Sequence, residues 1–168
     1  MSMPRSIRPQ SEAPEDAYER ERLDSVRPAD WHNPQPAPRY DLVIIGAGSA
    51  GQVAAYAAAA LGASVALVEH NLVGGNCLNI GCVPSKSLIR TSRVYAEMRN
   101  AEQYGVQRPA DIQVDFAAVM RRMRGIRARI SRAASVHRLV AANVDVFFGD
   151  ARFTDSDSLT VGDTPLQF

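Results

Sequence analysis

The pattern of apolar positions changes abruptly at Tyr40, where a polar, Pro-rich segment gives way to an apolar one. Leu42–Ile45 is an uninterrupted apolar run, typical of a parallel strand that is buried on both faces. Residues 51–61 are rich in alanine and predict a helix, which Gly62 would end as a left-handed cap. Residues 64–68 form a second apolar run, closed by Glu69. The order predicts a parallel strand-helix-strand unit.

The remaining pattern continues this α/β alternation. Helical spacing predicts helices over residues 85–100 and 115–142, and residues 144–148 and 159–168 are β-rich, with a turn at residues 155–158. We therefore expect an α/β fold, with a Rossmann-like domain and a parallel sheet over residues 40–168.

Residues 1–39 are expected to form a Pro-rich N-terminal extension, because they hold seven of the ten prolines and few large apolar side chains. Residues 16–26 could form one short helix, with Tyr18 and Leu23 as docking points. Trp31 could anchor the segment to the domain or stay loose, and the sequence leaves docking and disorder equally open.

Composition narrows the function classes. The chain has 168 residues, enough for one domain with a core but not for two nucleotide-binding domains. A formal net charge of +1 provides no global attraction to nucleic acid or to an anionic membrane. No apolar run follows Arg5 and Arg8, and glycines interrupt the apolar stretch after Tyr40, so we expect a cytoplasmic protein without a signal peptide or membrane span.

A glycine-rich turn lies between the first strand and the first helix. Residues 46–51 read Gly-Ala-Gly-Ser-Ala-Gly, which matches G-x-G-x-x-G in the strand-to-helix context of a dinucleotide site. The pattern predicts a tight turn at the first glycine, close approach of a pyrophosphate at the second, and helix-to-strand packing at the third. Glu69 would accept hydrogen bonds from the ribose hydroxyls. The predicted contacts are Gly46, Gly48, Ser49, Ala50, Gly51 and Glu69; a glycine turn without ligand is the alternative.

Both cysteines of the chain, Cys77 and Cys82, fall in one short segment. In a regular helix their Cα atoms would lie roughly 8–9 Å apart, whereas a disulfide needs less than about 7 Å. The flanking glycines and Pro84 favour a distorted helix start that could bring the sulfurs together. A helix N-terminus and Lys86 would lower the thiol pKa. Zinc binding and two unbridged core cysteines are the alternatives, although the three histidines show no metal-ligand spacing, and we expect no metal site.

Residues 74–86 resemble the G-G-x-C-x-x-x-x-C-x-P-[SK]-K signature of the class I pyridine nucleotide-disulfide oxidoreductases, which are flavoproteins. The resemblance implies FAD on the glycine turn, with further cofactor contacts at Gly75, Asn76 and Lys86. It also implies a redox-active disulfide in which Cys82 lies against the flavin and forms a charge-transfer thiolate, while Cys77 exchanges with substrate. NAD(P)H would be the electron donor, and the family member would be a homodimer.

Within that family, Pro84, Ser85 and Lys86 resemble dihydrolipoamide dehydrogenase and mercuric reductase. The run Leu88-Ile89-Arg90 and the Pro-rich lead-in that ends at Tyr40 resemble most the mercuric reductase-like branch, although a metal-capturing Cys-x-x-Cys is absent from the N-terminus. The substrate would be a small-molecule disulfide or a metal ion. A non-catalytic dinucleotide-binding or redox-sensing module is the alternative. We expect only the FAD-binding portion here, without the NAD(P) and dimerisation domains and without turnover on its own.

The region of residues 116–140 carries seven arginines, which would permit nucleic-acid binding. An apolar stripe at helical spacing favours instead a helix whose arginines lie on a solvated face or pack against another domain.

Overall fold

The computed structural model describes residues 16–108 and 110–168. Arg5 and Arg8, on which the expectation of no signal peptide depends, and Pro4, Pro9 and Pro14 lie outside this part of the chain. A parallel three-stranded sheet forms the centre of the fold, in the order β1 (Leu42–Ile45), β2 (Val65–Glu69) and β3 (Val144–Phe148). The crossover between β1 and β2 is α2 (Ser49–Ala60). The predicted strand-helix-strand unit and the α/β fold class are thereby confirmed. The expectation that the first strand is buried on both faces is wrong, because β1 lies at the edge of the sheet, with Leu42 37% and Ile45 53% exposed.

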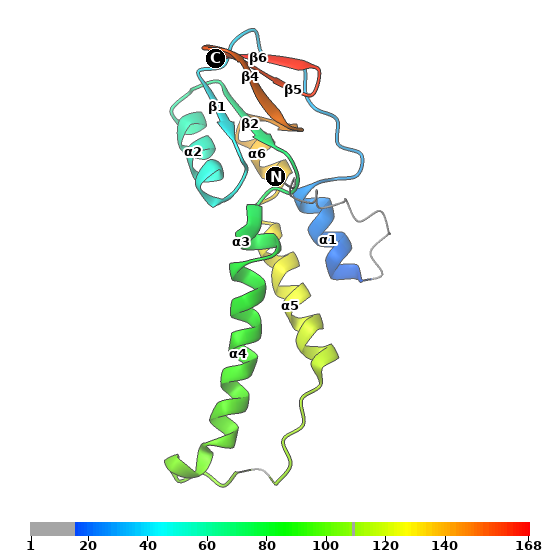
Figure 1. The fold of residues 1–168 in the computed structure, drawn as a ribbon, viewed down its shortest axis with the longest axis vertical. Helices are drawn as coiled ribbons and strands as arrows, with labels where there is room; N and C mark the ends of the chain where they lie inside the picture. Colours follow the sequence, from blue (N-terminus) through cyan, green and yellow to red (C-terminus); the bar gives the residue numbers. More distant parts are fainter. Residues whose placement is uncertain (1–15, 109) are drawn as a thin grey trace, which may run out of the picture.

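A second, antiparallel sheet follows β3. It consists of β4 (Ala151–Asp155), β5 (Ser158–Val161) and β6 (Thr164–Gln167), and the predicted turn connects β4 to β5. Leu159 and Leu166 from this sheet pack against Val68 and Phe147 from the parallel sheet. The two sheets, which lie at the top of Figure 1, therefore share one core.

Two long helices project away from the sheets as a pair (Figure 1). α4 (Cys82–Arg99) leads outward, and α5 (Phe116–Ser131) returns after the short 3-10 turn η1 (Ala101–Tyr104). α4 begins three residues earlier than the predicted helix, so Cys82 becomes its first residue.

The prediction of one helix over residues 115–142 is wrong. The chain breaks after α5 and resumes as α6 (Val136–Ala141). Ser135 starts the new helix as its N-cap, because its side chain accepts a hydrogen bond from the backbone N–H of Arg138.

The described part of the extension is docked on the domain, which resolves the open alternative. α1 (Ala17–Val26) lies along α5, and Val26 is fully buried in the main core. The Trp31 ring packs edge-on against Phe148, with 6.0 Å between centroids. Asn33 donates to the carbonyl oxygen of Phe148 and accepts from its N–H. The extension therefore covers the end of β3.

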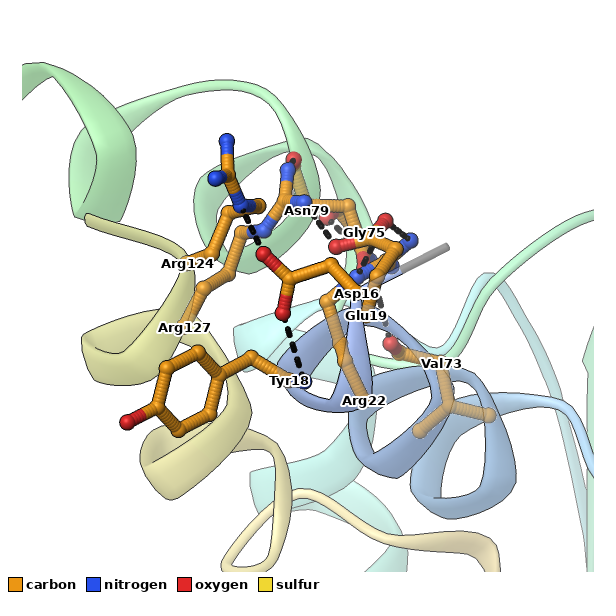
Figure 2. Close-up of polar contacts among 9 residues, drawn as sticks. All are labelled: Asp16, Tyr18, Glu19, Arg22, Val73, Gly75, Asn79, Arg124 and Arg127. Carbon is orange, nitrogen blue, oxygen red and sulfur yellow. Dashed lines mark hydrogen bonds and ion pairs between the residues drawn. The ribbon is translucent and has the colours of Figure 1, made fainter. Parts of the chain in front are cut away.

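The arginines of α5 do not simply form a solvated face. Arg124 pairs with Asp16, Arg127 with Glu19, and Arg132, just beyond the helix, with Glu21. Arg122 donates to Ser87 of α4. Acidic side chains of α1 thus meet basic ones of α5, and the ionic packing lies within this chain (Figure 2).

This ionic docking predicts an acid-sensitive contribution of Glu19 to stability. Burial raises the pKa of Glu19, but the hydrogen bond and charge of Arg22, with the charge of Arg127, outweigh burial and hold the pKa below its usual value. A depressed folded-state pKa stabilises the protein above the unfolded value of about 4.3, and the contribution disappears as pH falls through the folded pKa. We expect Glu19→Gln to cost roughly 1.5–3 kcal/mol of unfolding free energy at pH 7.

Urea unfolding of wild type and Glu19→Gln at successive pH values measures the difference in their unfolding free energies. The difference between the two proteins should shrink as the pH falls below about 4. A difference that stays constant down to acid pH would contradict the ionic origin.

Candidate functional site

The glycine turn between β1 and α2 has the geometry that its sequence predicts. Gly46 has a φ of 99°, in the left-handed region that favours glycine. A Cβ at Gly51 would overlap the carbonyl oxygen of Gly46, so a glycine is needed where α2 packs against the turn. At Gly48, the N-cap of α2, a Cβ would meet nothing within 4 Å. Ser49 and Ala50 begin α2, so open space lies in front of a helix N-terminus.

Glu69 lies at the end of β2, next to this turn. The residue is 5% exposed, and one carboxylate oxygen accepts a hydrogen bond from the N–H of Ala47 at 2.8 Å. The other oxygen accepts from the N–H of Asn71 at 2.8 Å and lies 3.3 Å from Nδ1 of His70. Glu69 is therefore fixed beside the glycine turn.

The cysteine segment is attached directly to the glycine turn. The N–H of Gly74 donates to the carbonyl oxygen of Ala47 at 2.8 Å. Gly75 has a φ of 60°, and a Cβ there would lie 2.9 Å from the Cα of Gly48. The two glycine clusters thus touch, which brings motifs nearly 30 residues apart into one site.

The two cysteines lie on either side of a helix break. Cys77 is in the middle of the one-turn helix α3 (Gly75–Asn79), and Cys82 is the first residue of α4. Gly81 lies at the break, where a Cβ would come within 2.9 Å of the carbonyl oxygen of Asn76 and 3.6 Å of the Cα of Cys77. The predicted distortion is therefore present, and glycine is what allows the chain to turn back so tightly.

The Cys77 and Cys82 side chains are free thiols within hydrogen-bonding reach of each other. The hydrogen bond to Cys82 raises the pKa of the Cys77 thiol, and burial and the charge of Cys82 act in the same direction. Lys86 and the backbone N–H of Cys82 oppose this rise. The expectation of a lowered pKa is thus wrong for Cys77 in the dithiol form, because the neighbouring thiol outweighs Lys86.

Lys86 and Asn76 are exposed, and Cys77 is less exposed than Cys82.

The glycine turn fits the diphosphate of an FAD. It offers open space at Gly48, free N–H groups at the start of α2, and the contact between the two glycine clusters. In the described residues no group of three or more His, Cys, Asp and Glu side chains is placed to hold a metal ion.

Two polar residues that hold the cysteine segment, Asn79 and Arg22, were not predicted from the sequence. Asn79, at the end of α3, accepts a hydrogen bond from Arg22 of α1 and another from Arg127 of α5. Asn79 stands between the two cysteines, which could have singled it out, but no local pattern points to Arg22.

Residues 40–168 match the family described as pyridine nucleotide-disulphide oxidoreductase. The chain belongs to this family, whose members are FAD-dependent enzymes that use NAD(P)H as electron donor. The resemblance of the glycine and cysteine motifs to it is thereby confirmed.

Curated relatives include a dihydrolipoyl dehydrogenase of Bacillus subtilis, 39% identical over 116 residues, which cover 69% of this chain and 24% of that protein. Another from Zymomonas mobilis is 41% identical over 131 residues, 76% of this chain and 27% of that protein. The chain thus spans about a quarter of the length of these relatives.

Among solved structures, the Cu(II) complex of the HOCl-induced flavoprotein disulfide reductase RclA of Escherichia coli is similar. Its TM-score is 0.55 at 31% identity, covering 74% of this chain and 25% of that one. Across the residues that the structure describes, no helix combines the length and apolar character that a bilayer crossing requires.

Proposed function

We propose that this chain forms the FAD-binding and dithiol portion of an enzyme that passes electrons from NAD(P)H to a disulfide substrate. The observation that carries the proposal is the contact of the glycine turn with the cysteine segment at Gly48 and Gly75. It brings two neighbouring thiols close to the open N-terminus of α2. A bound flavin would supply two-electron transfer between nicotinamide and the cysteine pair.

Different residues of the chain would hold different parts of the cofactor. Gly46, Gly48, Ser49, Ala50 and Gly51 would hold the diphosphate at the helix N-terminus, and Glu69 the ribose hydroxyls. Gly75, Asn76 and Lys86 would border the flavin ring, with Lys86 supplying positive charge.

The cysteine pair would reduce substrate by thiol-disulfide exchange. The thiolate of Cys77 attacks one substrate sulfur and releases the first product thiol; Cys82 then attacks Cys77, releases the second and restores the Cys77–Cys82 bond. The net reaction is NAD(P)H + H⁺ + disulfide giving NAD(P)⁺ and two thiols. The choice of Cys77 as the exchanging thiol rests on the family resemblance. Exposure alone would favour Cys82, which is the more exposed thiol in this chain.

A metal ion is a second candidate substrate, as in a mercuric reductase-like enzyme. The similarity to RclA, whose structure is a Cu(II) complex, supports including metal ions, whereas the dihydrolipoyl dehydrogenases support a dithiol-disulfide substrate. A homodimer and a cytoplasmic location, implied by the resemblance and by composition, stay predictions.

Steady-state assays of the protein expressed from its complete gene test this proposal. We expect oxidation of NADH or NADPH to depend on an added disulfide, with lipoamide and glutathione disulfide compared against Hg²⁺ and Cu²⁺. Metal-dependent oxidation without disulfide reduction would favour the second candidate. No oxidation with any acceptor, in a protein whose cysteines still form a reversible disulfide, would favour a redox-sensing module instead.

A further inference from the structure

The segment between the two cysteines is held by the helix of the Pro-rich extension. Nη1 of Arg22 in α1 donates to Oδ1 of Asn79 at 2.5 Å, although the two residues are 57 positions apart. Both side chains are buried, with 6% of Arg22 and 5% of Asn79 exposed. Figure 2 shows this contact where α1 passes α3. A buried arginine that donates to a buried amide points to a specific structural task, because a charge is costly to bury unless it is paired and hydrogen-bonded.

Asn79 fixes the short helix that carries Cys77. Its Nδ2 donates to the carbonyl oxygens of Gly75 at 2.9 Å and Val73 at 3.2 Å, at the entrance of α3. Its own carbonyl oxygen, at the end of α3, accepts from Nη1 of Arg127 at 2.8 Å. Asn79 therefore ties the two ends of a one-turn helix that has little stability of its own.

Glu19 couples the two arginines that hold Asn79. Its carboxylate accepts from Arg22 at 2.5 and 3.1 Å and also pairs with Arg127. One negative charge thus lies between two positive ones, and both guanidinium groups reach the same residue of the cysteine segment (Figure 2). The network connects α1, α3 and α5.

We propose that Arg22, acting through Asn79, is a positioning residue for the Cys77–Cys82 pair. Because the network restricts the α3–α4 break, it keeps the two sulfurs near bonding geometry. A dithiol held in this way loses less chain entropy when the disulfide closes, so the disulfide is favoured at equilibrium. This inference rests on the proposed redox role of the two cysteines.

The protein expressed from its complete gene, as wild type and as Arg22→Met, provides the test. Each protein is equilibrated in glutathione buffers, where the protein disulfide and two glutathione thiols exchange with the dithiol and glutathione disulfide. After acid quenching and alkylation, mass spectrometry counts Cys77 and Cys82 in each form. We expect Arg22→Met to shift the equilibrium about tenfold toward the dithiol, equivalent to a reduction potential about 30 mV higher.

Arg132→Met is the matched control. It removes the same charge and breaks an ion pair to the same helix, at Glu21, but the Arg132 side chain is 68% exposed and pairs with Glu21 rather than with Asn79. Its equilibrium constant should equal that of wild type. Near-UV circular dichroism verifies that each variant is folded.

The outcomes separate the inference from the function on which it rests. An unchanged equilibrium constant in folded Arg22→Met, or equal shifts in Arg22→Met and Arg132→Met, overturns the positioning role while the redox function stands. If Arg22→Met does not fold, Arg22→Lys and Glu19→Gln take its place. Equilibrium constants equal to that of wild type in both of these variants overturn the positioning role. If the wild-type disulfide forms in no buffer, the redox function fails first and the inference falls with it.

Discussion

Replacing Cys82 with serine should lower disulfide-dependent turnover by roughly 10³-fold or more, because a serine hydroxyl can neither bond to Cys77 nor carry the electrons of a disulfide. The same loss is expected for Cys77→Ser. The thiols act as a pair, so the double variant should be little worse than either single one. The measurement is kcat with a disulfide acceptor at saturating NAD(P)H, for each variant and for wild type.

Ile80→Val is the control for this prediction, because Ile80 lies between the cysteines and its side chain is exposed. It should leave kcat near the wild-type value. Turnover above about a tenth of wild type in either serine variant would show that the pair is not on the electron path.

A side chain at Gly48 should release the cofactor without disturbing the fold. The φ of Gly48 is −72°, which any L residue adopts, and its Cβ would enter open space. In Gly48→Val that space, where the diphosphate is proposed to lie, is filled. Losing two charge-assisted hydrogen bonds at about 1.5 kcal/mol each corresponds to roughly 10²-fold weaker FAD binding.

FAD titration of the flavin-free protein measures this affinity, and urea unfolding of the same sample measures stability. Ala54→Val adds a similar volume on the exposed face of α2 and should change neither. Wild-type affinity in Gly48→Val would move the diphosphate away from this turn. A large loss of stability without ligand would show that the glycine serves the fold instead.

The parts of this site that the sequence predicts are those with local causes. Gly46 and Gly51 are required by a turn and a close packing within six residues, and the bend between Cys77 and Cys82 follows from helix dimensions and nearby glycines. The break before α6 was also local, since Ser135 is a favourable N-cap, but the apolar periodicity that continues past it concealed the signal.

The parts that the sequence does not predict depend on long-range contacts. The docking of α1 joins Glu19 to Arg127 across 108 positions, and no periodicity records such a pair. The raised pKa of Cys77 likewise depends on how closely a second thiol approaches, which spacing alone leaves open. The residues that position the cysteines could therefore be identified only from the three-dimensional structure.

An anaerobic reductive titration tests the central claim most directly, since it counts the electrons that the cysteine pair and the flavin accept together. With the flavin-containing protein expressed from its complete gene, dithionite should deliver four electrons per flavin, two of them appearing as alkylatable thiols at Cys77 and Cys82. Uptake of only two electrons, with both cysteines equally alkylatable before and after reduction, would contradict the account.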